Sequence, residues 1–305
     1  MGPPDQGDTH GGSLPGILPP AAPVTDTALQ HPTRVGEDAT VVVIDAGAAT
    51  HAGAVRELNE DAVIVGSKIF AVADGMGGHA AGDVASAMTA EALLALDVAD
   101  VLRPADLVSE LLAISDTIAR RADAEPERWG MGTTVTGLAL VTVGGAQHWG
   151  IFNVGDSRVY HFVDGVLTRS TVDHSEVEEL VTAGRITEAE ARVHPDRNII
   201  TRSLGTMPAP QVDLWMVPPV EGERYLVCSD GLVNELEDAE IADVLATSPG
   251  NQEAVDRLME RALSRGARDN VTIVVVEVVA APGPSSGGNG TVATVPRGQL
   301  GSGKE

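Results

Sequence analysis

Hydrophobic and polar positions divide the 305-residue chain into a patterned centre and two unpatterned ends. Residues 1–37 are rich in Pro and Gly, residues 281–305 in Gly, Ser and Pro, and neither end has a helical or strand period. We predict a disordered leader and tail there, because neither segment buries enough apolar surface to offset its ordering entropy. The pattern continues without a linker from residue 38 to residue 280, which predicts one domain.

Most of the centre reads as strands. Runs of β-branched or alternating apolar residues predict strands at 40–44, 62–65, 69–73, 134–143, 148–154, 158–163, 166–168, 225–228 and 271–279. Short turns such as Gly66-Ser67, Gly144-Gly145 and Asp164-Gly165 separate several neighbours, and such turns join antiparallel strands.

Four stretches between the strands have helical spacing. One helix is indicated by Val84, Met88, Ala92 and Leu96, a second by Leu107, Leu111, Ile114 and Ile118, a third by the polar residues 174–193, and a fourth by residues 255–262, ended by Gly266. The helices do not alternate with the strands one by one. We therefore predict an α+β fold, in which two antiparallel sheets pack as a sandwich flanked by helices, in four layers αββα.

Composition narrows the classes of function. The formal net charge is −24, which disfavours nucleic acid and anionic membranes as partners. The single cysteine, Cys228, excludes an internal disulfide and a thiolate zinc cluster. No apolar run approaches the roughly 18 residues of a membrane span. We expect a cytoplasmic monomer.

Several aspartates share one local setting. Asp74, Asp156 and Asp230 each follow an apolar strand pattern, and Asp269 stands directly before the last strand. A single Asp-Gly pair is usually only a turn, but the repetition of the setting indicates a ligand site. Carboxylates without cysteine or paired histidines favour a hard cation, Mg²⁺ or Mn²⁺. Two such ions, about 3.5–4 Å apart, would activate a water molecule and neutralise a phosphoryl group.

A charged segment precedes the second predicted strand. Arg56 offers a planar fork to phosphate oxygens, and Glu60 and Asp61 add two carboxylates. Taken alone, this segment would be read as a solvated turn.

These motifs, in this order, resemble a known family. They are Arg56 to Asp61, Asp74-Gly75-Met76-Gly77-Gly78-His79, Gly132-Thr133-Thr134, Gly155-Asp156-Ser157-Arg158, Asp173-His174-Ser175, His194 to Asn198, Cys228-Ser229-Asp230-Gly231 and Asp269-Asn270. They look like the motifs of the metal-dependent protein phosphatases (PPM family, type 2C), and most like its bacterial members. The resemblance covers roughly residues 38–279.

The resemblance implies a serine/threonine phosphatase with two Mn²⁺ or Mg²⁺ ions and positions for a third. It implies that water activated at the binuclear centre hydrolyses phosphoserine and phosphothreonine in other proteins, including a Ser/Thr kinase and its targets. It also implies a flap at about residues 174–205. The metal ligands it implies are Asp74 for both ions, Asp230 and Asp269 for one, Glu60 and the Gly75 carbonyl for the other, and Asp156 with Asp230 for the third.

Two further roles follow from the resemblance. Asp61 would orient the attacking water, and Arg56 would bind the substrate phosphate. Two positions depart from relatives: Met76 replaces a histidine of animal members, and Asn234 replaces a third-metal aspartate of some relatives. Methionine carries no transferable proton, so the general acid is left unassigned, with a structural role favoured for His79.

Other classes fit fewer residues. Gly75-x-Gly77-x-x-Ala80 followed by Asp97 mimics a dinucleotide fingerprint, which would require a parallel sheet. A cysteine phosphatase would need Arg where Asn234 stands, and the segment around Ser157 lacks the last glycine of a hydrolase elbow. A non-enzymatic phosphoprotein-binding module is the remaining alternative, and loss of a metal carboxylate would be its sign.

Overall fold

The structure is a computed structural model that describes residues 42–77 and 81–281. The predicted leader, nearly all of the predicted tail, and His79 lie outside the described residues. Within the described ranges, no helix combines the length and the apolarity that crossing a bilayer demands.

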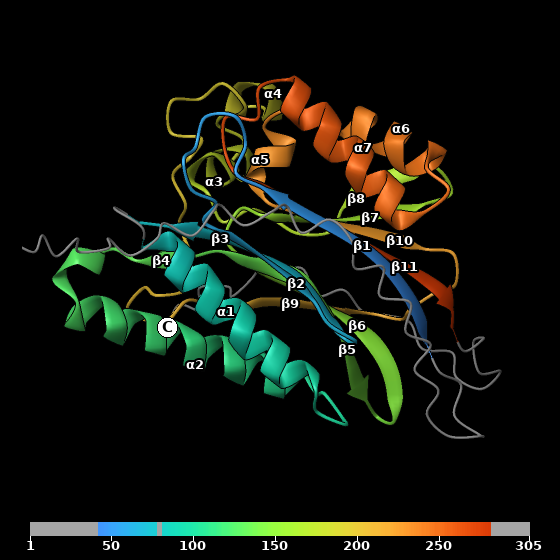
Figure 1. Ribbon diagram of the computed structural model, residues 1–305, viewed down its shortest axis with the longest axis horizontal. Coiled ribbons are helices and arrows are strands. Elements are labelled where there is room, and N and C mark those ends of the chain that lie inside the picture. The colour runs from blue at the N-terminus through green and yellow to red at the C-terminus, as the bar shows by residue number, and fades with distance from the viewer. Residues whose placement is uncertain (1–41, 78–80, 282–305) are drawn as a thin grey trace, which may run out of the picture.

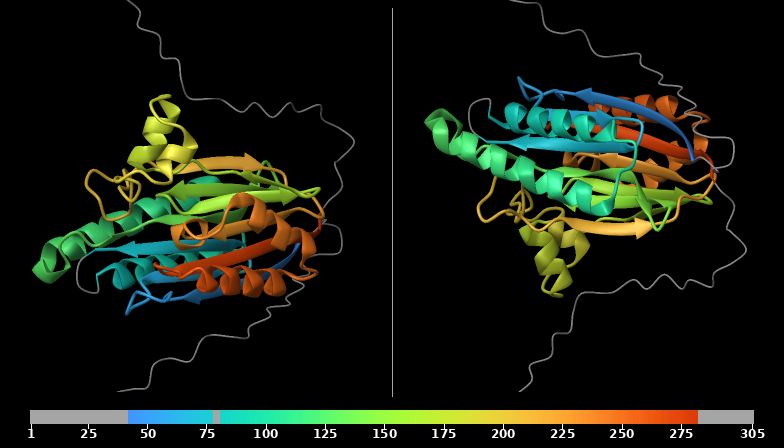
Figure 2. Two further views of the ribbon diagram at one scale, coloured as in Figure 1. Left: turned by 90° about the horizontal axis from the view of Figure 1, so that it is seen from above. Right: turned by 90° about the horizontal axis from the view of Figure 1, so that it is seen from below.

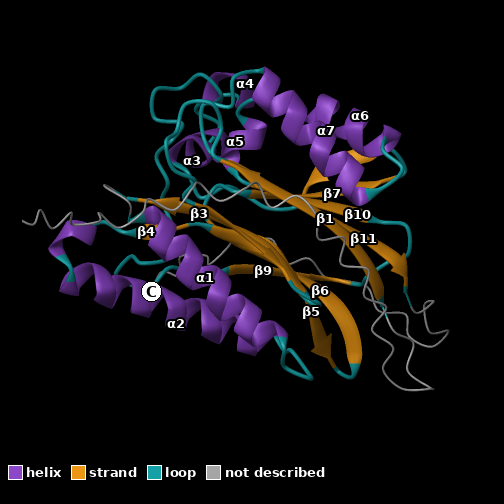
Figure 3. Cartoon of the chain, viewed as in Figure 1, coloured by secondary structure: helices purple, strands orange, loops and turns teal. Residues whose placement is uncertain are grey.

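Two antiparallel sheets form the centre of the molecule, as predicted (Figures 1 and 3). The first has the order β1-β11-β10-β7-β8, with bounds Val43–His51, Val271–Ala280, Arg224–Cys228, Arg158–Val163 and Val166–Arg169. The second has the order β2-β3-β5-β6-β9, with bounds Asp61–Val65, Ile69–Met76, Val135–Val143, Ala146–Val154 and Asp213–Val217. The short strand β4 (Gly132–Thr133) pairs with the end of β3.

Helices cover the outer face of each sheet (Figures 1 and 2). Helices α1 (Gly82–Asp97) and α2 (Pro104–Ala124) lie on the second sheet, and the 3₁₀ turn η1 (Pro126–Arg128) follows α2. Helices α6 (Asp238–Thr247) and α7 (Asn251–Ser264) lie on the first sheet. The short helices α3 (Glu176–Thr182), α4 (Glu188–Ala191) and α5 (Asp230–Val233) gather at one end of the sandwich.

The core between the sheets contains aliphatic side chains around three aromatic rings. Trp149 makes edge-on contacts with Phe70 and with Tyr225, at centroid distances of 6.2 and 6.1 Å. Phe70 and Trp149 belong to the second sheet and Tyr225 to the first, so these rings join the two layers. The predicted α+β sandwich is confirmed.

Several predicted elements need correction. The first strand was predicted at residues 40–44, of which 40 and 41 lie outside the described residues, and it is observed from Val43 to His51. Its small residues allow α7 to approach closely, because a Cβ on Gly47 would lie 2.5 Å from the Gln252 backbone. The polar stretch 174–193 is not one helix but two, separated around Gly184, whose φ is +66°. Strand β9 and helices α5 and α6 were not predicted.

Asp97 has a structural role that excludes the dinucleotide alternative. Its carboxylate accepts bonds from the backbone N–H groups of Ser67, Lys68 and Ile69, each at 2.7 Å, and from the Ser67 hydroxyl at 2.9 Å. It therefore fixes the β2–β3 hairpin to the end of α1 and has no oxygen left for a ribose. All strand pairs of the described chain are antiparallel, whereas a dinucleotide fold needs a parallel sheet.

Candidate active site and metal centre

Carboxylates from both sheets gather at one end of the sandwich. Asp61 opens β2 and is paired in register with Asp74 on β3, so the two lie on adjacent strands of the second sheet. Asp230 follows β10 as the first residue of α5, and Asp269 stands two residues before β11. Asp74 was predicted at a strand end, but it lies inside β3. Gly75 and Met76 continue this strand by pairing with β4.

Asp61 is buried and held in one orientation. Its Oδ2 accepts a bond from the Thr272 hydroxyl at 2.7 Å, and Thr272 belongs to β11 of the other sheet. Its Oδ1 has no partner among the described residues. Burial, with repulsion from Asp230 and Asp269, raises the pKa of Asp61 to about 7. An ionised Asp61 therefore needs a compensating positive charge.

Asp74 is positioned through its backbone. Its carbonyl accepts bonds from the Thr134 N–H at 2.8 Å and the Thr133 hydroxyl at 2.9 Å, while its N–H donates to the Thr134 hydroxyl at 3.1 Å. The side chain is left free to face the other carboxylates. Burial, then repulsion from Asp61 and Asp230, raises the pKa of Asp74 well above its ordinary value.

Glu60 and Gly75 are joined to the start of α1. The Glu60 carbonyl accepts bonds from the Gly75 N–H at 3.2 Å and the Ser86 hydroxyl at 2.6 Å. A Cβ on Gly75 would lie 2.3 Å from the Gly82 carbonyl oxygen, so only glycine allows this approach. Burial, followed by repulsion from Asp83, raises the pKa of the Glu60 carboxyl.

Arg56 and Asp269 form an ion pair at the mouth of the site. The Arg56 Nη2 atom lies 2.8 Å from Asp269 Oδ2, and both side chains are substantially exposed to solvent. The bond and the attraction to Asp269 raise the pKa of the guanidinium. The predicted phosphate-binding arginine therefore lies beside a predicted metal ligand.

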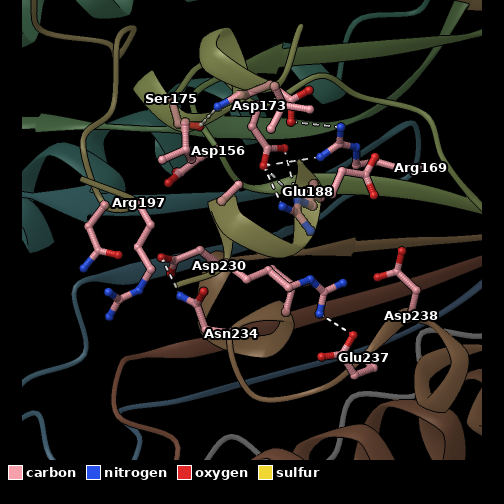
Figure 4. A pocket seen from close by; sticks show the side chains of 18 of the residues that line it. Asp156, Arg169, Asp173, Ser175, Glu188, Arg197, Asp230, Asn234, Glu237 and Asp238 are labelled. Atoms are coloured by element: carbon pink, nitrogen blue, oxygen red, sulfur yellow. Dashed lines mark hydrogen bonds and ion pairs between the residues drawn. The ribbon is translucent and has the colours of Figure 1, made fainter. Parts of the chain in front are cut away.

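A pocket of about 330 Å³ opens beside Asp156 and Asp230 (Figure 4). Side chains of α3 and α4 line it, which places the predicted flap next to the site. Asp230 Oδ2 accepts a bond from Asn234 at 3.0 Å, and Asp156 Oδ1 has no partner within the described part of the chain. Burial, with repulsion from Asp269, raises the pKa of Asp230 to about 6. Burial, with repulsion from Asp230 and Asp173, raises the pKa of Asp156 well above its ordinary value.

The donor chemistry fits hard divalent cations. All side chains of the cluster are carboxylates, and two of their buried oxygens, Asp61 Oδ1 and Asp156 Oδ1, have no partner among the described residues. Burial, with repulsion from other carboxylates of the cluster, raises the pKa values of Asp61, Asp74 and Asp230. Among residues 42–77 and 81–281, no three acidic, His or Cys side chains are already arranged to hold a metal ion. Asp269 is paired with Arg56 and Asp230 with Asn234, and the Arg56–Asp269 pair is exposed to solvent.

Comparison with known sequences decides the family. The profile of the family "Protein phosphatase 2C" matches residues 50–271. The chain belongs to the protein phosphatase 2C family. This phosphatase 2C chain is 42% identical over 242 residues to the serine/threonine protein phosphatase PstP of Mycobacterium tuberculosis. The match covers 78% of the chain and 46% of PstP, so the chain spans about half the length of that relative.

Other phosphatase 2C relatives match over nearly their whole length. The serine/threonine phosphatase stp of Listeria welshimeri is 36% identical over 244 residues, covering 75% of this chain and 93% of that protein. The crystal structure of the catalytic domain of PstP in complex with two manganese ions superposes with a TM-score of 0.69 at 40% identity. That match covers 79% of this chain and all of the PstP domain.

Sequence reasoning missed several residues that support the site in this phosphatase 2C chain. Asn270 accepts the Glu60 N–H at 2.9 Å and donates to the carbonyls of Ala52 and Leu58, so it fixes the loop that carries Arg56. Thr272 fixes Asp61 from the opposite sheet. Asn270 follows Asp269 in the sequence, and Thr272 comes two residues later. Only the pairing of the strands shows which groups their side chains bind.

His174 supports the turn before Asp156. Its Nδ1 accepts the Gly155 N–H at 3.0 Å, which places the proton on Nε2, 3.1 Å from Asp213. Both ring nitrogens therefore have partners within the protein, which indicates a structural role for His174. Within the Asp173-His174-Ser175 motif, the histidine thus supports the structure of the turn.

Proposed function

We propose that this chain is a metal-dependent phosphatase that hydrolyses phosphoserine and phosphothreonine in proteins. The observation that carries the proposal is the group of buried carboxylates from two sheets that raise one another's pKa values. Such a group is stable in its ionised form only with bound cations. The names of the relatives PstP and stp, both serine/threonine phosphatases, support the type of substrate.

We propose the following division of roles. Two Mn²⁺ or Mg²⁺ ions would neutralise the phosphoryl group and activate a water molecule as the nucleophile. The residues that would hold these ions are Asp74, Asp230, Asp269, Glu60 and the carbonyl of Gly75, with Asp156 at a third position.

The side chains beside the ions would do the positioning. Asp61, fixed through Oδ2 by Thr272, offers its unpaired Oδ1 to a hydrogen of the attacking water and so orients the oxygen toward phosphorus. Arg56, released from Asp269, presents two N–H groups to the phosphate oxygens. Asn270 keeps the Arg56 loop in place during this exchange.

A direct test uses the purified chain. We expect hydrolysis of para-nitrophenyl phosphate and of a phosphothreonine peptide with Mn²⁺, and none with EDTA. Asp74→Asn removes a charge that both ions would share, so turnover should fall at least about a hundredfold, by loss of several kcal/mol of electrostatic stabilisation. Asp100→Asn, an exposed carboxylate at the far end of α1, is the matched control and should retain full activity.

Metal binding is measured separately from turnover. Calorimetric titration should give two Mn²⁺ sites in the wild type and weaker binding in Asp74→Asn. Mn²⁺ binding without hydrolysis of either substrate would contradict the proposal and leave the non-enzymatic phosphoprotein-binding module. Equal Mn²⁺ affinity in the two proteins would contradict the assignment of Asp74.

We also propose the setting in which the chain acts. Residues 38–280 form the catalytic domain, flanked by the leader and the tail. The substrates are phosphorylated proteins, including a Ser/Thr kinase and its targets, met by a monomer in the cytoplasm of a bacterium. Comparison of phosphorylated proteins in cells with and without the gene tests this, and unchanged phosphorylation of all serine/threonine sites would contradict it.

A further inference from the structure

Trp129 is the most exposed large hydrophobic side chain of the described residues, with 82% of its surface accessible. It follows η1 in the loop that connects α2 to β4. Large aromatic side chains are usually buried, and an exposed one often marks a contact with another molecule. Trp129 has no part in the core or in the carboxylate cluster, so its exposure requires another explanation.

The loop presents Trp129 in a fixed position. The Arg128 N–H donates to the Glu125 carbonyl at 2.8 Å, and the Met131 N–H donates to the Arg128 carbonyl at 3.0 Å. The Arg128 and Glu125 side chains form an ion pair at 2.6 Å, and Met131 is buried. Gly130 has a φ of +81°, which turns the chain sharply between the exposed Trp129 and the buried Met131.

The same loop is bonded to the segment that carries Asp74. Gly132 pairs with Met76, and the Thr134 N–H donates to the Asp74 carbonyl. A Cβ on Gly77 would lie 3.3 Å from Met131 Cα and 3.4 Å from the Gly130 carbonyl. The residues that follow Trp129 are thus packed against the end of the strand that carries Asp74. The C-terminal end of α2 and β4 lie at the same end of the molecule as α3 and α5 (Figure 1).

A second exposed apolar side chain lies on the neighbouring loop. Met207 is 70% accessible. Its loop packs on the Trp129 loop, because Leu204 pairs with Thr133 and a Cβ on Gly205 would lie 2.8 Å from the Met131 carbonyl. Methionine adapts its shape to different partners, and tryptophan contributes a large rigid area.

We propose that Trp129, with Met207, docks an apolar side chain of the phosphorylated protein substrate beside the carboxylate cluster; this rests on the proposed phosphatase function. The occupant is a substrate segment because the Trp129 loop leads directly into β4, which pairs with the end of β3, the strand that carries Asp74. Glu125, which is also bonded to Arg121, carries no unbalanced charge that would oppose an apolar contact.

The test compares two tryptophan-free 15-residue phosphothreonine peptides. One has leucine at alternate positions around the phosphothreonine, and the other has serine there. We expect the wild type to favour the leucine peptide about tenfold in kcat/KM, mainly through KM, since a buried aromatic anchor of an interface typically contributes that much. Trp129→Ala should lose this preference and Trp129→Tyr should keep most of it. An unchanged preference in Trp129→Ala would overturn the proposal.

Two controls separate the proposal from its alternatives. Val98→Ala, on a residue that is 80% accessible just after α1, removes an exposed apolar side chain elsewhere and should leave the leucine preference intact. Sedimentation at assay concentration should give the same mass for wild type and Trp129→Ala. A dimer that dissociates on this substitution would show a contact between copies of the chain and overturn the docking role.

Fluorescence gives a measurement that needs no turnover. Trp149 is buried and Trp215 half-buried, so acrylamide quenching reports mainly on Trp129. With EDTA present, the leucine peptide should protect Trp129 from quenching and the serine peptide should not. Protection without hydrolysis of para-nitrophenyl phosphate by the wild type would leave the docking surface standing while the proposed function fails. Equal quenching with both peptides would overturn the docking surface alone.

Discussion

At the scale of single residues, the carboxylates that would hold cations are also a source of instability. Asp74 is surrounded by Asp61, Asp230 and Asp156, and each of them raises its pKa. Burial of like charges is unfavourable unless a counter-charge is present. The cluster is therefore expected to lower the stability of the protein when no ions are bound.

This conflict predicts that loss of function and gain of stability coincide. Asp74→Asn removes one buried charge, so in EDTA we expect the free energy of unfolding to rise by about 1 kcal/mol, as for other substitutions that relieve strain at functional sites. Urea unfolding of the two proteins measures it. An unchanged free energy of unfolding for Asp74→Asn in EDTA would mean that proton uptake already relieves the repulsion at this position, and a lower one would contradict the prediction.

His174 predicts a pH dependence of stability. Burial lowers the pKa of its imidazole below the ordinary value of 6.5. The hydrogen bond to Asp213 raises this pKa and the positive charge of Arg202 lowers it, and the lowering effects are larger. The unfolded chain therefore takes up a proton before the folded protein does, so this residue makes folding less favourable as the pH falls through 6.5. His174→Asn keeps an acceptor for Gly155 without a titrating group. Between pH 8 and pH 5.5 the wild type should lose more unfolding free energy than the variant, and equal losses would refute this role.

At the scale of elements, the β2–β3 hairpin depends on one side chain outside it. Asp97, at the end of α1, accepts four bonds from Ser67, Lys68 and Ile69. Asp97→Ala leaves buried N–H groups unpaired, and we expect a loss of about 2–3 kcal/mol in unfolding free energy. Asp100→Ala, on an exposed neighbour, is the control and should be near neutral. A loss of the same size in both variants would mean that helix α1 as a whole, and not the hairpin, is affected.

The sequence predicted elements well where one face is buried and periodic. Leu107, Leu111, Ile114 and Ile118 are all buried on α2, as their spacing indicated. On α1 the helix was right, but the deepest line is Ala85, Thr89 and Leu93, beside the predicted one, because small residues let the helix approach Gly75. The bounds of strand β1 were misplaced because most of its residues are small and give no apolar pattern. These small residues allow helix α7 to pack closely on the strand.

The elements that were missed lack a strong period of their own. Helix α5 has only four residues. Strand β9 is an edge strand with prolines on both sides, and the side chains of the strand are only half-buried. The site was predicted as a set of residue types, because repeated strand-end aspartates are visible in the sequence. The contacts that orient these residues were not predicted, because they join residues far apart in the chain. Thr272 binds Asp61 across 211 residues, Asn270 binds Glu60 across 210, and His174 binds Gly155 across 19.

At the scale of the whole molecule, the candidate ligands belong to both layers of the sandwich. Asp61 and Asp74 are on the second sheet, whereas Asp230 and Asp269 adjoin strands of the first. A cation bound by both pairs would connect the sheets in addition to the Thr272–Asp61 bond. Metal binding should therefore stabilise the fold as a whole and not only the loops of the site.

This predicts a large effect of Mn²⁺ on unfolding. At a free Mn²⁺ concentration about 100 times the dissociation constant, the unfolding free energy should rise by about 2.7 kcal/mol per site. Thermal unfolding with Mn²⁺, with EDTA, and with NaCl at equal ionic strength measures it. The rise should be smaller in Asp74→Asn, and a melting temperature that is the same with Mn²⁺ and with EDTA would contradict the shared site.

The aromatic contacts between the sheets have a consequence at the distant carboxylates. Phe70, Trp149 and Tyr225 hold the two layers at a set separation, and the two halves of the ligand set are attached to those layers. We therefore expect the volume of these three rings to influence the ionic radius that the carboxylates would accommodate best. Discrimination between Mg²⁺ and Mn²⁺ is, on this view, a property of the hydrophobic core, and substitutions that never touch a metal ligand can alter it.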